Sequence, residues 1–155
     1  MTGTIDARIQ GIQKVYIDSM AFVYFIEESP AYIAAVDRLF ARIDDGQLQA
    51  CTSYLTLLEV LVKPIRTGNA ALVSQYREIL TRGRNLELVP VGQQVAEKAA
   101  EIRAQPHAER IRTPDSIHVA TAVCQNADMF VTNDLRLRRH AGIVDILALD
   151  DVVRI

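Results

Sequence analysis

The residues Val15-Tyr16-Ile17-Asp18-Ser19 decide the fold, because they contain a short apolar strand that ends at a carboxylate. β-Branched and aromatic residues favour a strand, and an uncharged run of them indicates a buried one. A helical apolar pattern follows Asp18 at once and continues to about residue 28, where Ser29 and Pro30 interrupt it. A buried strand that passes directly into a helix is typical of an α/β sheet.

The same alternation continues along the chain. We expect Thr52 or Ser53 to cap a helix that Pro64 stops, and Thr113 to cap a helix with Pro114 in its first turn. Further strands are predicted at residues 48–52, 86–89, 129–132 and 144–149, and further helices at 31–45, 53–62, 69–82, 93–104, 113–126 and 135–140.

Strands that alternate with helices pair in parallel through right-handed crossovers. The sequence therefore predicts one α/β domain over residues 15–155, a five-stranded parallel sheet with helices on both faces, after a polar lead-in at residues 1–14. A length of 155 residues suits a single domain.

Composition excludes several classes of protein. Half of the residues are hydrophobic and 23% are charged, which is ordinary for a folded domain. The net charge of −2 leaves no overall basic field for nucleic acid, so a polyanion would need local patches. Cys51 and Cys124 form no C-x-x-C motif, and the apolar run from Met20 to Ile26 is too short to span a bilayer. We expect a cytoplasmic protein without a membrane partner.

Four carboxylates lie where a strand gives way to a helix or just inside that helix. Asp18 ends the first strand, Asp134 follows the fourth, and Glu59 and Asp115 lie on helices that start at the same sheet edge. Ligands of open parallel sheets bind beyond the carboxyl ends of the strands. Clustered carboxylates beside apolar runs are costly unless a cation neutralises them, and hard oxygen ligands suit Mg²⁺ or Mn²⁺. Such a site predicts phosphodiester chemistry.

Each acid also has a simpler explanation. Asp18 and Asp134 could be helix N-caps, and Asp115 could favour the positive end of a helix dipole. Glu59 could pair with Lys63 on a surface. However, Glu59 lies in a nearly continuous apolar run, so we predict that it is buried.

Other chemistries have no motif here. The sequence lacks a P-loop, a G-x-G-x-x-G turn and a G-x-S-x-G elbow. His118, three residues after Asp115, could brace that acid or be hydrogen-bonded within the fold.

The sequence motifs around the acids resemble those of the PIN-domain family, most closely those of the VapC-like toxins of bacterial and archaeal toxin–antitoxin pairs. The resemblance covers about residues 15–149, and its motifs are specific in combination. They are Val15-Tyr16-Ile17-Asp18-Ser19, Thr52-Ser53-Tyr54-Leu55-Thr56-Leu57-Leu58-Glu59-Val60, Arg112-Thr113-Pro114-Asp115-Ser116-Ile117-His118 and Phe130-Val131-Thr132-Asn133-Asp134.

The resemblance implies an endoribonuclease that cuts single-stranded RNA with Mg²⁺ or Mn²⁺. Asp18, Asp115 and Asp134 would bind the metal, and Glu59 would act through a ligated water or as a base. It further implies a type II toxin that forms a homodimer, joins a larger toxin–antitoxin assembly and is inhibited by a cognate antitoxin.

Several supporting residues follow from the same comparison. Many relatives carry asparagine where this chain has Met20, so we expect Ser19 to supply part of the bracing of Asp18. Thr132 and Asn133 match the family's polar surroundings of the last acid. Basic residues near the acids could position RNA phosphates or simply be solvated, namely Arg110, Arg112, Arg136, Arg138 and Arg139.

Two other functions would also explain part of this sequence pattern. A receiver-like signalling domain also gathers acids at a sheet edge, but it would need adjacent acids after the first strand and a lysine after the last, where this chain has Asp150 and Asp151. A PIN-like domain that binds RNA or a partner without cutting is the other alternative, against which the four acids argue.

Overall fold

The computed structural model describes residues 3–106 and 111–153. Its sheet has five parallel strands in the order β3-β2-β1-β4-β5, as predicted. The strands are β1 (Lys14–Ile17), β2 (Gln49–Ser53), β3 (Leu86–Val89), β4 (Met129–Thr132) and β5 (Ile146–Ala148). The last strand is shorter than predicted, and the other four lie within one residue of the predicted bounds.

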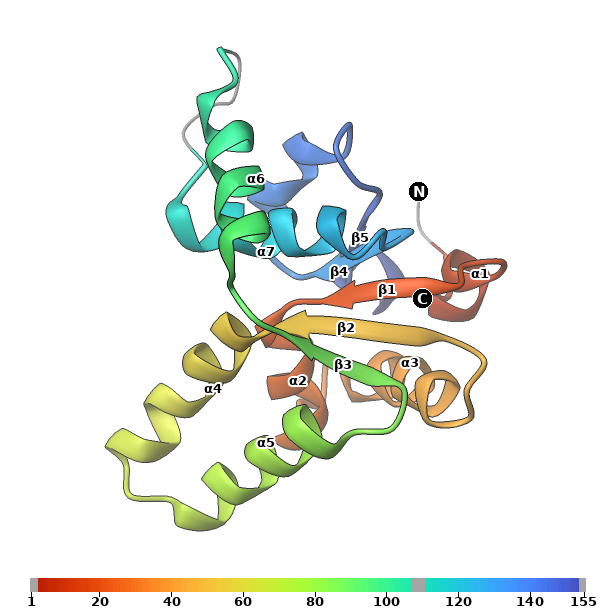
Figure 1. Ribbon diagram of the computed structural model, residues 1–155. Helices are drawn as coiled ribbons and strands as arrows, with labels where there is room; N and C mark the ends of the chain where they lie inside the picture. Colours follow the sequence, from red (N-terminus) through yellow and green to blue (C-terminus); the bar gives the residue numbers. More distant parts are fainter. Residues whose placement is uncertain (1–2, 107–110, 154–155) are drawn as a thin grey trace.

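Helices cover both faces of the sheet, which confirms the predicted layers (Figure 1). Helices α6 and α7 pack together on one face, and α2, α3 and α5 lie on the other. The helices are α1 (Ile5–Ile9), α2 (Ser19–Ile26), α3 (Ile33–Asp44), α4 (Tyr54–Arg66), α5 (Ala70–Arg82), α6 (Gln93–Ala104), α7 (Thr113–Cys124), the 3₁₀ helix η1 (Leu135–His140) and α8 (Asp150–Val153). None in the described part of the chain could cross a membrane.

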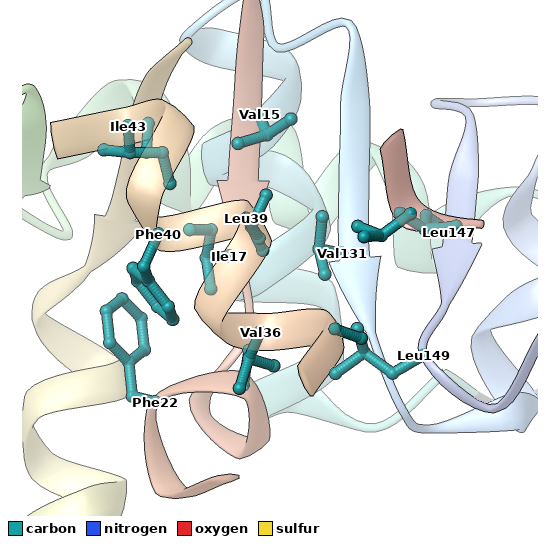
Figure 2. Close-up of a cluster of buried hydrophobic side chains, with 14 of the residues drawn as sticks. Val15, Ile17, Phe22, Val36, Leu39, Phe40, Ile43, Val131, Leu147 and Leu149 are labelled. Atoms are coloured by element: carbon teal, nitrogen blue, oxygen red, sulfur yellow. The ribbon is translucent and has the colours of Figure 1, made fainter. Parts of the chain in front are cut away.

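Alternation along the central strands divides the core into two halves. Val15 and Ile17 of β1 point to the face covered by α2 and α3, whereas Tyr16 between them points to the face covered by α6 and α7. Figure 2 shows the first half, where Val15, Ile17 and Val131 meet side chains of α3. Because successive strand residues face opposite sides, a strand buried on both faces must be apolar throughout.

The structure corrects three local predictions. Helix α4 does not stop before Pro64 but continues to Arg66, because a proline in the last turn removes only one helical hydrogen bond and its ring is buried. Thr113 is the first helical residue of α7, and Arg112 holds the cap position without a side-chain cap. The lead-in contains helix α1, whose Ile5 and Ile9 are buried against the core.

The strand order determines at which edge of the sheet a ligand can bind. From β1 the chain moves outward to β2 and β3, then returns to the other side of β1 with β4 and β5. The order therefore reverses between β1 and β4, and the carboxyl ends of these neighbours flank a switch point where ligands bind. A receiver domain has the strand order 2-1-3-4-5, so this sheet is not one.

Candidate active site

Asp18 is the acid most enclosed by the fold. It follows β1 and caps α2, where its Oδ1 accepts a hydrogen bond from the Ser19 backbone N–H at 2.7 Å. The Ser19 hydroxyl lies 3.4 Å from the same oxygen, and Thr132 donates to Oδ2 at 2.8 Å. Asp18 is thus an N-cap, as its simpler explanation required, yet it is only 9% exposed. A cap on a plain surface helix would not be buried in this way.

Thr132 connects Asp18 to Asp134 across the switch point. Its hydroxyl donates to Asp18 and accepts the Asp134 backbone N–H at 3.0 Å. The Thr132 side chain is fully buried, and so is its hydrogen bond to Asp18. One hydroxyl therefore connects the Asp18 carboxylate to the Asp134 backbone.

Replacing Thr132 with valine should lower the free energy of unfolding by about 1–3 kcal/mol, because the Asp134 N–H and one oxygen of Asp18 lose a buried partner. Urea denaturation measures the change. Thr81→Val is the control, since Thr81 is exposed and donates only within its own helix. Equal losses in the two variants would show that the bridge is unimportant.

His118 joins Asp18 to Glu59. Its Nε2 donates to Oε1 of Glu59 at 2.6 Å and lies 3.6 Å from Oδ1 of Asp18. On the other side of the ring, Nδ1 is hydrogen-bonded to the Tyr16 hydroxyl at 2.6 Å. Burial alone would lower the pKa of His118, but the hydrogen bond to Glu59 and the charges of Asp18, Glu59 and Asp115 outweigh burial and raise it.

The prediction that Glu59 is buried was wrong. Helix α4 lies at the edge of the molecule, so its apolar run has a solvent face with Glu59 on it. The Glu59 side chain is 34% exposed, and its partner is His118 rather than Lys63. The exposed apolar residues of the same helix are Tyr54, Leu58, Val62 and Ile65, which are 44–62% exposed.

Asp115 and Asp134 are paired with arginines. Arg112 contacts Asp115 at 3.0 Å and Asp134 at 3.8 Å, so it spans the two acids. Arg136 contacts both oxygens of Asp134, at 2.9 and 2.6 Å. The hydrogen bond from Arg136 lowers the pKa of Asp134 despite its partial burial, which keeps the carboxylate ionised.

The other predicted site residues are spread more widely. Asn133 points away from the acids, since its amide donates to the Tyr24 hydroxyl at 2.9 Å and its Oδ1 accepts the Asp150 N–H. Met20, where many relatives have asparagine, is 41% exposed, so Ser19 and Thr132 brace Asp18 without it. Arg138 pairs with Asp151.

Arg139 lines a small pocket of about 70 Å³ beside Asp115, together with Arg112 and Arg136. Arg110 lies outside the described residues. The arginines nearest the acids are therefore Arg112 and Arg136, both on segments that flank this pocket.

Hydrogen bonds and ion pairs thus connect the four acids in two linked groups. Ligand atoms of Asp18, Glu59 and His118 all lie within 4.8 Å of one another, and the Thr132 and Arg112 contacts extend the cluster to Asp134 and Asp115. Sequence reasoning did not place His118 in this cluster. Its position three residues after Asp115, on the same helix face, was the available signal.

Comparison with known proteins agrees with this architecture. The PIN domain family model matches residues 15–143, so the chain belongs to the PIN domain family. No curated protein sequence matches the chain.

Solved structures of toxin–antitoxin proteins share the fold at low sequence identity. VapBC2 from Rickettsia felis, bound to a promoter DNA fragment, superimposes with a TM-score of 0.68 at 17% identity and covers 88% of this chain and 98% of that one. VapBC-1 from nontypeable Haemophilus influenzae gives 0.65 at 16%, over 89% and 99%. Mycobacterium tuberculosis VapC20, a sarcin–ricin loop cleaving toxin, gives 0.61 at 15%, over 75% and 86%.

Proposed function

We propose that this protein is a Mg²⁺- or Mn²⁺-dependent endoribonuclease that hydrolyses RNA phosphodiester bonds. One observation carries the proposal: the buried carboxylate of Asp18 is joined to Glu59 through His118 and to Asp134 through Thr132. Acids from separate parts of the chain thereby meet at the switch point of the sheet, where ligands of such sheets bind.

The residues fit a hard divalent cation. Asp18 is 9% exposed, and its contacts in the described structure are Ser19, Thr132 and His118, with no lysine or arginine among them. Asp18 and Glu59 have carboxylate oxygens within 4.8 Å of each other. Two carboxylates this close repel one another, and the charge of one histidine does not fully compensate them. Carboxylate oxygens suit Mg²⁺ and Mn²⁺. Asp18, Asp115 and Asp134 would hold the ion.

A bound ion of this kind neutralises a phosphodiester and makes water a better nucleophile. Glu59 would orient that water and accept its proton, because its side chain is exposed to solvent while its Oε1 is fixed by His118. Thr132 would hold the Asp18 carboxylate in place relative to the Asp134 backbone.

Arg112 and Arg136 would position the RNA. Their side chains are 58% and 60% exposed although they contact the acids, so each could exchange a carboxylate for a phosphate. Surface ion pairs contribute only about 0–1 kcal/mol, which makes the exchange inexpensive. Phosphate contacts place the strand, and the choice of sequence would come from exposed bases in RNA loops.

A toxin role is supported by the solved structures that share the fold, several of which are toxin–antitoxin complexes. We propose that this protein is likewise a cytoplasmic toxin, inhibited by a cognate antitoxin within a larger assembly. The exposed apolar row of α4 supports a homodimer, because such rows mark interfaces on soluble proteins.

Cleavage of RNA by the purified protein tests the nuclease proposal. With Mg²⁺ or Mn²⁺, a labelled single-stranded RNA should be cut at internal positions, and EDTA should abolish the cutting because the acids then lack their ion. A DNA strand of the same sequence is the matched substrate control. Tight RNA binding without cleavage under either ion would instead favour the non-catalytic PIN-like domain.

A further inference from the structure

A chain of hydrogen bonds runs from the core to Glu59, the most exposed of the four acids of the site. It begins at the Tyr16 hydroxyl, passes through both ring nitrogens of His118 and ends at Oε1 of Glu59, with both links at 2.6 Å. Tyr16 is fully buried and His118 is 2% exposed, so the link between them is shielded from water, whereas the link to Glu59 is only partly buried. Both ring nitrogens of His118 are therefore engaged within the protein.

The His118 ring is fixed from the core side. Its edge meets Tyr16 with centroids 5.8 Å apart and an angle of 65° between the ring planes. Tyr16 in turn stacks on Phe130 of β4, with centroids at 4.9 Å and an angle of 18°. Packed rings inside a core have little rotational freedom. The orientation of His118 is thus set by β1 and β4, the two strands that flank the switch point.

The Glu59 side chain is held much less firmly than the His118 ring. It projects from a face of α4 that also exposes Leu58 and Val62, and its hydrogen bond to His118 reaches over 59 residues of sequence to another helix. Ordering a glutamate side chain costs rotamer entropy, and a hydrogen bond to its carboxylate offsets that cost.

We propose that His118, itself held by Tyr16, is a positioning residue that fixes the Glu59 carboxylate beside Asp18. This inference rests on the proposed nuclease function. The geometry supports it directly, because Nε2 of His118 lies 2.6 Å from Oε1 of Glu59 and 3.6 Å from Oδ1 of Asp18. Groups that hold the carboxylates of a metal site in this way change metal affinity or activity about 10- to 100-fold when they are replaced.

Two amide variants at His118 separate positioning from simple packing. In His118→Gln the amide nitrogen falls near Nε2 and can still donate to Glu59, whereas in His118→Asn it falls near Nδ1 and reaches only toward Tyr16. We expect His118→Gln to bind Mn²⁺ within about threefold of the unmodified protein, and His118→Asn to bind it at least about tenfold more weakly. Titration calorimetry with Mn²⁺ alone measures both.

Turnover should follow the same order. His118→Asn should lower kcat for RNA cleavage by at least about tenfold with KM nearly unchanged, because the RNA-contacting arginines are untouched. The melting temperatures of the two variants should be alike. If both variants lose Mn²⁺ affinity equally, and the losses follow their losses of melting temperature, His118 has only a packing role. That result would overturn the inference.

A measurement on metal-free protein tests the positioning role of His118 independently of the proposed nuclease function. With ¹⁵N-labelled histidine, the His118 ring N–H proton should be protected from exchange and far downfield, and Glu59→Gln should shift it. No shift would overturn the inference whether or not the protein cuts RNA. A shift together with Mn²⁺ binding but no RNA cleavage would support the positioning role and count against the nuclease.

Discussion

Replacing Asp18 with asparagine should lower metal-dependent RNA cleavage more than about a hundredfold, since changes in outer-shell residues alone cost about 10- to 100-fold. Asparagine keeps an oxygen that can accept from the Ser19 N–H and an amide that can face Thr132, so the cap of α2 and the bridge to β4 should survive. What is lost is a negative charge at a site that is 9% exposed. Initial rates with labelled RNA at saturating Mn²⁺ measure the effect.

Asp45→Asn is the matched control, because it removes the same charge from an exposed position at the end of α3. It should cut RNA at the unmodified rate. Circular dichroism should show that both variants are folded. Cleavage by Asp18→Asn within a few fold of the control would remove Asp18 from the site, and with it the proposed metal centre.

Replacing Phe22 with alanine should lower the free energy of unfolding by about 3–5 kcal/mol, a large part of the roughly 5–15 kcal/mol of a typical domain. Phe22 is fully buried under α3, with its ring 5.4 Å from that of Phe40 (Figure 2). The truncation leaves a cavity beneath the first turn of α2, the helix that Asp18 caps. Urea denaturation followed by circular dichroism measures the change.

Met20→Ala controls for the Phe22 variant on the same helix. Met20 is 41% exposed, so its truncation should change stability by less than about 0.5 kcal/mol. Similar losses in the two variants would mean that Phe22 is not packed in the core beside Phe40 as Figure 2 shows.

Much of the fold could be predicted from local pattern. Short apolar runs such as Val15–Ile17 and Met129–Thr132 are buried on both faces, so their composition alone marks them as strands. Pro64 and Thr113 were placed wrongly because a proline in a final turn and a threonine at a helix start each allow two positions. Those choices depend on what packs around the helix end.

The site was predictable only in part. Asp18 and Asp134 follow strands, and adjacent strands bring them together. Glu59 was assigned to the interior because its neighbours are apolar, but the face of α4 that carries it is not covered within the described structure. His118 entered the site through contacts with Tyr16, Glu59 and Asp18, which lie far from it in the chain, and its spacing from Asp115 was the local signal.

The order of strands and helices along the chain, and the carboxylates that follow the strands, could be predicted from short stretches, because burial and capping depend on a few neighbouring residues. Which of those residues meet depends on how the folded chain packs. The sheet order sets β4 beside β1, which lets the Thr132 hydroxyl join two acids and holds His118 between Glu59 and Asp18. The reason is physical: these contacts join residues that are far apart in the chain, and their distances exist only once the core has packed.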